Sequence, residues 1–435
     1  MNLLTAFQQF CSRIDFARTI WIAYSGGLDS HVLLFLCHQL NTQKSFKFRV
    51  IHVNHNISPH AASWAKHCRE MCEQYAMDYI ERDVHLNYQQ GESPEEAARD
   101  ARYSIFAEYL DQDDLLLTAH HQDDQAETVL LQLMRGAGPK GLSAMPVIKP
   151  FAKGFHVRPL LDFPRTELLQ YAQENHLQWI EDESNQDTAL SRNFIRHEVL
   201  PLLQSRWPKV SASLSRSALH CAENQSLLED YLQDDYQQVI GSRTNTLSVS
   251  KLLSFDVAKQ RLLLRAWIYQ MNCPLPDTKK MQSIQQNVLS AAWDKLPLVQ
   301  WGDVRLRRHR DDLYLLSAIR EPDVNQTFEW NMDQSLVLPH GILKTSLVQG
   351  RGLRLDKNLV SVRFRQGGEV VDLPARGRHT LKNLFQEWNI LPWERDHLPL
   401  IFMEEKLIAI AGWYVHEDFI ATENEMGREI IFERE

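Results

Sequence analysis

The stretch TIWIAYSGGLDSHVLLFLCHQL, residues 19–40, predicts a β-strand, a tight turn and an α-helix in direct succession. The apolar residues before the turn form a run that ends at Tyr24, as expected of a strand that is buried on both faces. From Leu28 onward, apolar residues recur at helical spacing. Strand, turn and helix together are the basic unit of an α/β fold, and we expect the N-terminal region to be built around this unit.

The turn contains two consecutive glycines, Gly26 and Gly27, among polar residues. Glycines leave the backbone N–H groups accessible, and the N-terminus of the following helix adds a positive dipole, so the turn predicts a phosphate-binding site. It is not a Walker loop, because it lacks the lysine followed by Ser or Thr. Ser25 and Ser30 supply hydroxyl groups instead, and Asp29 is placed to bind a divalent cation beside the phosphates.

The composition is that of a globular protein. Of the 435 residues, 44% are hydrophobic and 24% are charged, which predicts about two to four domains. No apolar run reaches the ~18 residues of a membrane span, and the polar N-terminus predicts an amphipathic helix instead of a signal peptide. The six cysteines form no CxxC pair, so we expect a cytoplasmic protein. A net charge of −9 at first argues against binding to nucleic acid. Local basic patches can still bind phosphates, however.

Predicted strands and helices alternate beyond residue 40, which indicates a doubly wound parallel sheet with helices on both faces. Ligands of such sheets bind at the carboxyl ends of the strands, where residues 25–30, 52–55 and 120–124 are expected to converge. We predict strands at residues 48–55, 78–84 and 113–121, and helices at residues 59–77, 93–110 (with Ser93 in a capping box) and 122–136.

The stretch HHQDDQAET begins the last of these helices. Asp124, Glu127 and Thr128 have i, i+3 and i+4 spacing, so they share one helix face. Acidic residues near a helix N-terminus can simply be favourable partners of the helix dipole. At the same sheet edge as Asp29, they are instead suited to binding Mg²⁺ or an amine.

Basic residues follow this acidic helix. A glycine-rich loop contains Arg135 and Lys140 and is suited to fold over a ligand. A later helix bears Arg192 and Arg196 one turn apart, a spacing that would bind a phosphate group. The alternative is a solvent-exposed helix face whose arginines pair with Glu198.

These stretches resemble a known family. SGGLDS resembles the PP-loop signature of ATP pyrophosphatases, which split ATP into AMP and pyrophosphate. Several stretches resemble the tRNA(Ile)-lysidine synthetase family in order and spacing. They are SGGLDS, HVNH, AARDARY, HHQDDQAETVLLQLMRGAG, RPLL, and EDESN followed by RNFIRHEVLP. Four later stretches are similar to the C-terminal domain of the same family, namely FRQGGE, LKNLFQE, PWERDHLPL and AIAGW.

The resemblance implies three blocks and a connector. These are a PP-loop catalytic domain at residues 1–208, a mostly helical tRNA-binding domain at 209–317, a connector at 318–350 and an α+β tRNA-binding domain at 351–435. The middle block ends in a predicted hairpin that contains Arg305, Arg307, Arg308 and Arg310. The basic residues expected to face RNA phosphates in the last block are Arg363, Arg365, Arg376, Arg378 and Lys382.

The resemblance also implies an activity. The family joins free lysine to the wobble cytidine of the isoleucine tRNA with a CAU anticodon, which switches codon reading from AUG to AUA. ATP adenylates the base, pyrophosphate leaves, and the ε-amine of lysine then displaces AMP. ATP and Mg²⁺ are therefore the implied cofactors, and this tRNA and lysine are the implied partners, with no membrane. The resemblance leaves open whether the protein forms a homodimer.

Each motif receives a role in this scheme. The residues that would bind ATP are Ser25, Gly26, Gly27, Leu28, Asp29 and Ser30. Mg²⁺ would bind Asp29 and Asp124, and Glu127 would bind the lysine ammonium group, with Asp124 as the alternative. Substrate phosphates would be anchored by Arg135, Arg192 and Arg196. His120 and His121 fit either general acid–base groups or buried, hydrogen-bonded side chains.

Three other functions are weighed against this one. A PP-loop tRNA 2-thiolation enzyme would need a cysteine pair near the motifs. A PP-loop synthetase for a small molecule would need a glutaminase partner or domain, and would leave the C-terminal blocks unexplained. An RNA-binding module with an inactive ATPase would not need Asp29, Asp124 and Glu127.

Overall fold

The computed structural model describes residues 2–13, 19–42, 46–55, 58–84, 94–317, 322–355, 358–373 and 376–434. The chain divides into two compact units, residues 1–231 and 232–435. None of the described helices is both long and apolar enough to cross a membrane.

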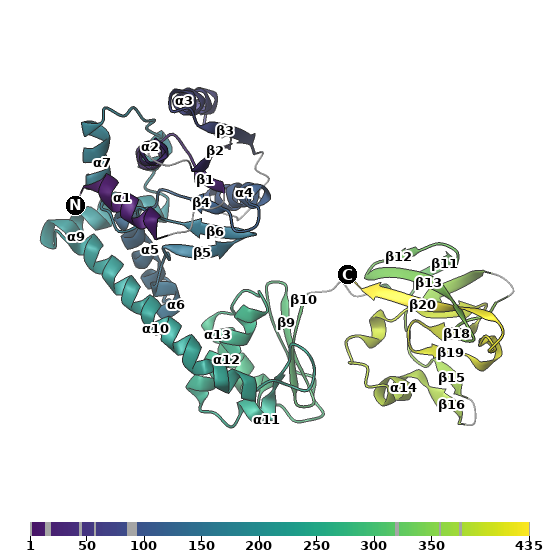
Figure 1. Cartoon of the computed structure of the whole chain (residues 1–435). Coiled ribbons are helices and arrows are strands. Elements are labelled where there is room, and N and C mark those ends of the chain that lie inside the picture. Colours follow the sequence, from purple (N-terminus) through teal and green to yellow (C-terminus); the bar gives the residue numbers. More distant parts are fainter. Residues whose placement is uncertain are drawn as a thin grey trace. The chain divides into compact units, whose positions relative to one another are not determined.

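A six-stranded sheet forms the centre of the first unit, with the strand order β3-β2-β1-β4-β6-β5 (Figure 1). Its parallel strands are β1 (Thr19–Ala23), β2 (Lys47–Asn54), β3 (Asp78–Asp83), β4 (Leu115–Leu117) and β6 (Gly154–Val157). The edge strand β5 (Ile148–Phe151) is antiparallel to β6. The predicted parallel sheet is therefore confirmed, although β4 is shorter than the expected strand at residues 113–121.

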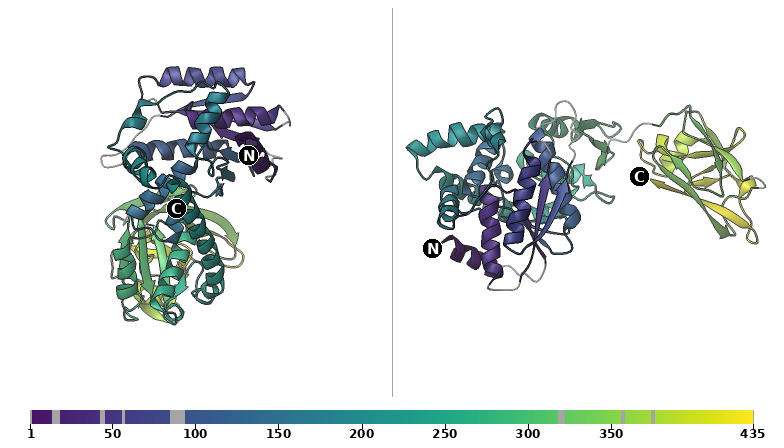
Figure 2. Two further views of the ribbon diagram at one scale, coloured as in Figure 1. Left: turned by 90° about the vertical axis from the view of Figure 1, so that its left-hand side faces the viewer. Right: turned by 90° about the horizontal axis from the view of Figure 1, so that it is seen from above.

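Helices cover both faces of this sheet (Figure 2). Side chains alternate along β1, so that Ile20 and Ile22 enter one hydrophobic core and Trp21 enters the other. The first core is completed by α1 (Leu3–Ser12), α2 (Leu28–Asn41), α3 (Ala61–Gln74) and α7 (Arg165–Glu174). The second is completed by α4 (Pro94–Tyr109), whose predicted cap Ser93 lies outside the described residues.

The remaining helices of the first unit follow β4 and α7. They are α5 (Gln122–Met134), α6 (Pro139–Leu142), the 3₁₀ turn η1 (Glu183–Gln186), α8 (Ser191–Phe194), the π-helical turn η2 (Ile195–Val199) and α9 (Leu200–Arg206). The long helix α10 (Val210–Gln238) begins in the first unit and continues into the second.

The second unit begins with short helices beside a four-stranded sheet of order β7-β10-β9-β8. The helical elements are α11 (Val249–Leu252), α12 (Val257–Gln270), α13 (Thr278–Ser283) and the π-helical turn η3 (Ile284–Val288). The strands are β7 (Leu247–Ser248), β8 (Leu298–Trp301), β9 (Val304–His309) and β10 (Asp312–Ser317). The predicted hairpin is thus part of a larger sheet, because β7 pairs with β10 across a long sequence separation.

The C-terminal part of the second unit is rich in strands. One sheet contains β11 (Thr327–Asn331), β14 (Leu359–Arg363), β17 (Leu400–Met403), β18 (Lys406–Ile410) and β19 (Tyr414–Val415). A second contains β12 (Leu336–Leu338), β13 (Gly341–Gln349) and β20 (Met426–Arg434), and a third contains β15 (Val370–Leu373) and β16 (Gly377–Thr380). Helix α14 (Leu381–Glu387) and the 3₁₀ turns η4 (Arg395–His397) and η5 (Glu417–Phe419) complete this part.

The region expected to be a connector differs from that expectation. Within residues 318–350, the structure has the strands β11, β12 and β13. β13 pairs with β20 from Gly341 opposite Arg434 to Gln349 opposite Met426. The partner strand lies far along the chain, so the local pattern did not indicate this pairing. The three predicted boundaries between these segments stay a prediction.

Candidate active site

The glycine turn between β1 and α2 is shaped by close contacts. Gly26 has a φ of +83°, and a Cβ atom there would lie 2.7 Å from Ile180 Cδ1 and 2.9 Å from Cys68 Sγ. Its carbonyl oxygen accepts a hydrogen bond from the Ile180 backbone N–H at 2.9 Å. Gly27 is the N-cap residue of α2. Since any side chain at Gly26 would be strained and obstructed, this position requires glycine.

Serine hydroxyl groups brace the turn internally. Ser30 Oγ donates to the Gly27 carbonyl oxygen at 3.0 Å and accepts from the Ser25 backbone N–H at 3.3 Å. Ser30 is buried, whereas Ser25 is exposed. Leu28 is also buried, in the hydrophobic core. We infer that Ser30 and Leu28 hold the shape of the turn, and that its backbone N–H groups and Ser25 remain suited to a phosphate.

Asp29 lies between a histidine and an arginine at the start of α2. Its Oδ2 atom is 3.6 Å from His121 Nε2, and its Oδ1 atom is 3.8 Å from Arg165 Nε. The Oδ1 atom is buried and has no hydrogen-bond partner. A buried carboxylate oxygen without a donor is costly, and its chemistry fits an oxygen-preferring cation such as Mg²⁺.

Asp124 and Glu127 form a compact charge network with Arg192 and Arg196. Asp124 Oδ1 accepts from the Nη2 atoms of both arginines, at 2.9 and 3.0 Å. Glu127 Oε2 accepts from Arg192 Nε at 2.8 Å, and Glu127 Oε1 accepts from Arg196 Nε at 2.6 Å. The Glu127 side chain is only 1% exposed. The two arginines therefore pair with these carboxylates and not with Glu198. Their two positive charges balance the two negative charges of Asp124 and Glu127.

Local structure positions the network. His121 is the N-cap of α5 and forms a capping box with Asp124, which fixes the first turn of the helix and the direction of the Asp124 side chain. On the other side, the π-helical turn η2 follows α8, and the Leu200 N–H donates to the Ile195 carbonyl oxygen. Such π-turns are common at functional sites because they re-aim side chains. This turn carries Arg196.

The charges of the network shift its own pKa values. Burial works to raise the pKa of Asp124, but His121 and Arg192 hold it well below its usual range. Burial works to lower the pKa of His121, but Asp124 and Asp29 raise it overall. His121 Nε2 is 3.4 Å from Asp124 Oδ2, so this histidine lies between the two carboxylates expected to share Mg²⁺. Among the described residues, no group of three or more His, Cys, Asp or Glu side chains is arranged to hold a metal ion.

A row of histidines leads away from this network. Thr118 Oγ1 is hydrogen-bonded to His120 Nδ1 at 2.7 Å and to His156 Nε2 at 2.8 Å, and His156 Nδ1 contacts Arg158 Nη2 at 3.1 Å. Burial lowers the pKa of His120 to about 3 and that of His156 to about 2. Both rings are therefore neutral at pH 7, which favours the structural interpretation of His120. No role was predicted for Arg158, because a single arginine after a short hairpin has no distinctive pattern.

The basic residues expected to bind phosphates elsewhere have varied surroundings. Arg135 is exposed at the end of α5, and Lys140 pairs with Glu229. In the middle of the chain, Arg308 is buried and donates to backbone carbonyls near the end of η3, so it is not available to RNA.

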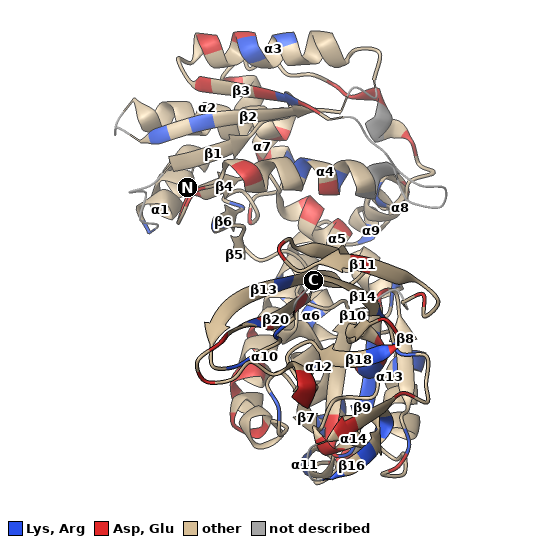
Figure 3. Cartoon of the chain, turned by 90° about the vertical axis from the view of Figure 1, so that its right-hand side faces the viewer, with Lys and Arg blue, Asp and Glu red and all other residues tan. Residues whose placement is uncertain are grey.

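The C-terminal arginines are mostly paired with carboxylates. Arg363 pairs with Glu405, and Arg376 makes two hydrogen bonds to Glu387. The others pair as Arg365 with Asp396 and Glu369, and Arg378 with Asp372 at 3.9 Å. Lys382 is exposed and has no ion pair within the described parts of the chain. Figure 3 shows acidic and basic segments interspersed over the strands of the C-terminal part.

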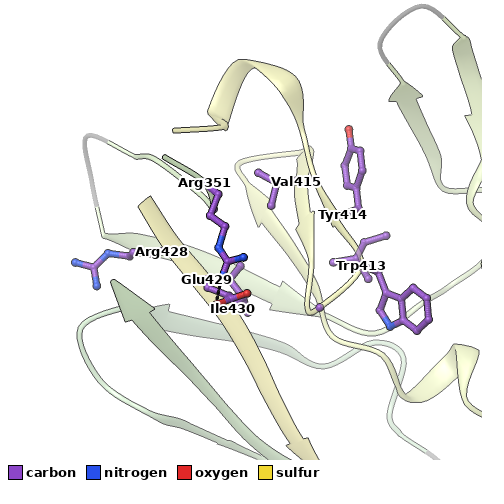
Figure 4. Close-up of a pocket in the computed structure, with 10 residues that line it drawn as sticks. Arg351, Trp413, Tyr414, Val415, Arg428, Glu429 and Ile430 are labelled. Atoms are coloured by element: carbon purple, nitrogen blue, oxygen red, sulfur yellow. Dashed lines mark hydrogen bonds and ion pairs between the residues drawn. The ribbon is translucent and has the colours of Figure 1, made fainter. Parts of the chain in front are cut away.

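A hollow of about 250 Å³ lies in the C-terminal part (Figure 4). Two of its lining arginines are neutralised by carboxylates, since Arg351 pairs with Glu429 and Arg428 pairs with Asp333. The Trp413 side chain extends away from the Arg351–Glu429 pair. We assign no anion-binding role to this hollow.

The fold and the site define an α/β protein with a phosphate-binding PP-loop. A family model described as a PP-loop domain matches residues 2–203. Two further models match later parts of the chain, one described as the TilS substrate binding domain at residues 247–314 and one as the TilS substrate C-terminal domain at residues 360–431.

Relatives of similar length give the family. A tRNA(Ile)-lysidine synthase of Coxiella burnetii is 42% identical over 98% of this chain and 94% of its own length. That of Methylococcus capsulatus is 42% identical over 92% of this chain and 93% of its own, and that of Serratia proteamaculans is 40% identical over 96% and 95%. The chain belongs to the tRNA(Ile)-lysidine synthase family. The predicted family and fold class are thereby confirmed.

Proposed function

We propose that this ATP-dependent ligase attaches free lysine to the wobble cytidine of the isoleucine tRNA with a CAU anticodon, switching its reading from AUG to AUA. The observation that supports it is the placement of two carboxylates suited to an amine, Asp124 and Glu127, in a network beside His121 and Asp29. Family membership favours this function over tRNA 2-thiolation.

The PP-loop would bind the phosphates of ATP. Gly26 and Gly27 present backbone N–H groups at the N-terminus of α2, where the helix dipole favours negative charge. As the cytidine 2-oxo group attacks the α-phosphate, charge develops on the leaving pyrophosphate, and fixed donors stabilise it without reorganising. Ser30 would act by keeping the turn in this shape.

Asp29 is the residue of this chain best suited to hold Mg²⁺. Its buried Oδ1 atom lacks a donor and lies beside the phosphate-binding turn. When bound, Mg²⁺ would supply charge neutralisation for the phosphates. Asp124 is occupied by two guanidinium groups, so it would join Asp29 as a ligand only after Arg192 and Arg196 move.

The charge network would exchange partners as substrates bind. ATP and the adenylated base bring phosphate groups, for which Arg192 and Arg196 are suited as bidentate donors. Lysine brings an ammonium group, for which Glu127 and Asp124 become available once the arginines turn to phosphate. Glu127 would then position the ε-amine and receive the proton that it loses on attacking the base. The closed network keeps Glu127 out of solvent until both substrates are present.

A thiolation function would require an accessible cysteine thiolate. Cys68 and Cys72 are the cysteines of α3, and both are buried. Burial raises the pKa of both thiols, that of Cys72 to about 12. These thiols would remain protonated at pH 7, which argues against a role as sulfur carriers.

The proposal is tested by combining the protein with ATP, Mg²⁺, radiolabelled lysine and the CAU isoleucine tRNA. We expect AMP formation and transfer of the label to this tRNA, and none to the elongator methionine tRNA. Transfer of labelled sulfur without lysine would favour the thiolation alternative. Asp29→Asn is expected to abolish transfer while tRNA binding is retained; loss of tRNA binding would contradict the role of Asp29.

A further inference from the structure

A basic cluster lies next to the charge network, at the carboxyl end of β6. We define the Arg158 cluster as Arg99, Lys149 and Arg158. Arg158 is 2% exposed, and its Nε atom is buried without a hydrogen-bond partner. Its Nη1 atom donates to the Pro146 carbonyl oxygen at 2.7 Å, and its Nη2 atom contacts the neutral His156. None of the three cations forms an ion pair with a carboxylate of the described residues.

The three cations are close enough to influence one another. Lys149 lies opposite His156 in the pairing of β5 with β6, next to Arg158. The Tyr103 ring lies 5.5 Å from the His156 ring and 5.3 Å from the Arg99 guanidinium group. Burial lowers the pKa of Lys149, and the charges of Arg158 and Arg99 lower it further.

Concentrated positive charge in a partly buried place is unfavourable unless an anion compensates it. The described residues supply no such anion here, although they supply carboxylates to other arginines of the first unit, such as Arg192 and Arg196. A small anion is therefore the missing partner. The cluster is connected to the catalytic network through His156, Thr118 and His120, and the His120 and His156 rings are 6.1 Å apart.

We propose that the Arg158 cluster binds the α-carboxylate of the lysine substrate. This inference rests on the proposed function, which places the ammonium group of lysine at Glu127 and Asp124. Lysine carries opposite charges at its two ends, and the site offers carboxylates and cations on the two sides of His120. Arg99 and Lys149 contact the carboxylate, while the buried Arg158 stabilises it from below and is fixed by Pro146 and His156.

The test compares lysine with lysinamide, in which a neutral amide replaces the carboxylate. The wild-type enzyme is expected to show a KM for lysine about tenfold lower than for lysinamide, since a hydrogen-bonded charge pair contributes about that much. In Lys149→Gln and Arg99→Gln, the KM for lysine should rise about tenfold, while the KM for lysinamide, the KM for tRNA and kcat change little. Lys149→Arg should restore the preference.

Lys153→Gln is the matched control, because Lys153 is an exposed lysine in the turn between β5 and β6. It should leave both KM values unchanged. An equal rise for lysine and lysinamide would overturn the proposal, and a rise in the KM for tRNA alone would assign the cluster to an RNA phosphate instead. If wild-type enzyme transfers neither lysine nor lysinamide, the proposed function fails, which is a different outcome from a lost preference.

Discussion

Glu127 shows how much the site depends on single charges. Its side chain is almost fully buried, and both of its oxygens accept hydrogen bonds from guanidinium groups. Removing one member of a buried, hydrogen-bonded charge network leaves the others uncompensated. The residues proposed for chemistry are therefore also residues on which stability depends.

Glu127→Gln keeps the size of the side chain and removes its charge. We expect the free energy of unfolding to fall by about 3 kcal/mol, because Arg192 and Arg196 lose their main counter-charge, and lysine transfer to be lost. Urea unfolding followed by circular dichroism measures the first effect. The control Glu198→Gln changes an exposed residue of η2, the turn that also carries Arg196, and should stay within about 0.5 kcal/mol of wild type. Equal effects of the two substitutions would contradict the buried network.

His121 predicts a pH dependence. Its pKa is raised above the unfolded value by Asp124 and Asp29, so the protonated form stabilises the fold. This contribution is fully present below about pH 6.5 and is lost as the pH rises through the folded pKa. The difference in unfolding free energy between wild type and His121→Gln should therefore shrink as the pH rises above about 6.5.

The difference between the two proteins is the informative quantity. Other buried histidines, such as His120 and His156, have lowered pKa values and contribute the opposite slope in both proteins. A difference that grows with pH would show that His121 is neutral in the folded state.

At the scale of elements, the PP-loop depends on packing from outside itself. The turn is enclosed by Ile180 and Cys68, which come from a distant segment and from α3. Gly27 also forms a parallel bridge with Ile180. The phosphate-binding geometry therefore requires that the segment after α7 be folded against the turn.

Gly26→Ala should disrupt this element. The φ of +83° costs an L-residue roughly 1–2 kcal/mol, and the new Cβ would collide with Ile180 and Cys68. We expect ATP binding, measured by isothermal titration calorimetry, to weaken at least tenfold. Gly138→Ala is the matched control, since Gly138 has no atom within 4 Å of an added Cβ and lies at the start of α6. Unchanged ATP affinity in Gly26→Ala would contradict the close packing.

At the scale of the whole molecule, a chain with a net charge of −9 is a member of a family that modifies tRNA. Most of the C-terminal arginines form ion pairs with neighbouring carboxylates, so the number of basic residues overstates what is available to RNA. Phosphate contacts should then come from the few cations that form no ion pair among the described residues. Lys382, at the start of α14, is one of them.

Lys382→Gln should weaken tRNA binding and reduce the slope of log K against log salt concentration by about 1. The matched control is Lys406→Gln, because Lys406 is an exposed lysine that pairs with Asp418. Lys406→Gln should reduce the slope by less than Lys382→Gln does. Filter binding across a salt series measures both. If Lys406→Gln reduces the slope as much as Lys382→Gln does, ion pairing within the protein does not decide which cations contact RNA.

The amino-acid sequence was sufficient to predict the strand, turn and helix at residues 19–40, the alternation that builds the parallel sheet, and the family that the motifs indicate. These features follow from short-range patterns, because apolar periodicity, caps and consecutive glycines act within a few residues. The sequence also identified Asp29, Asp124 and Glu127 as acidic groups at one sheet edge.

The partners of these groups became known from the fold. Glu127 meets Arg192 across 65 positions of the chain, β13 pairs with the C-terminal strand β20, and within the described residues the buried Arg158 Nε atom has no hydrogen-bond partner. Local sequence patterns do not indicate such partners. The partners are set by the packing of distant elements and by the balance of burial against charge. The glycine turn was therefore evident from the sequence, but the closed charge network and the basic cluster beside it became visible only in the fold.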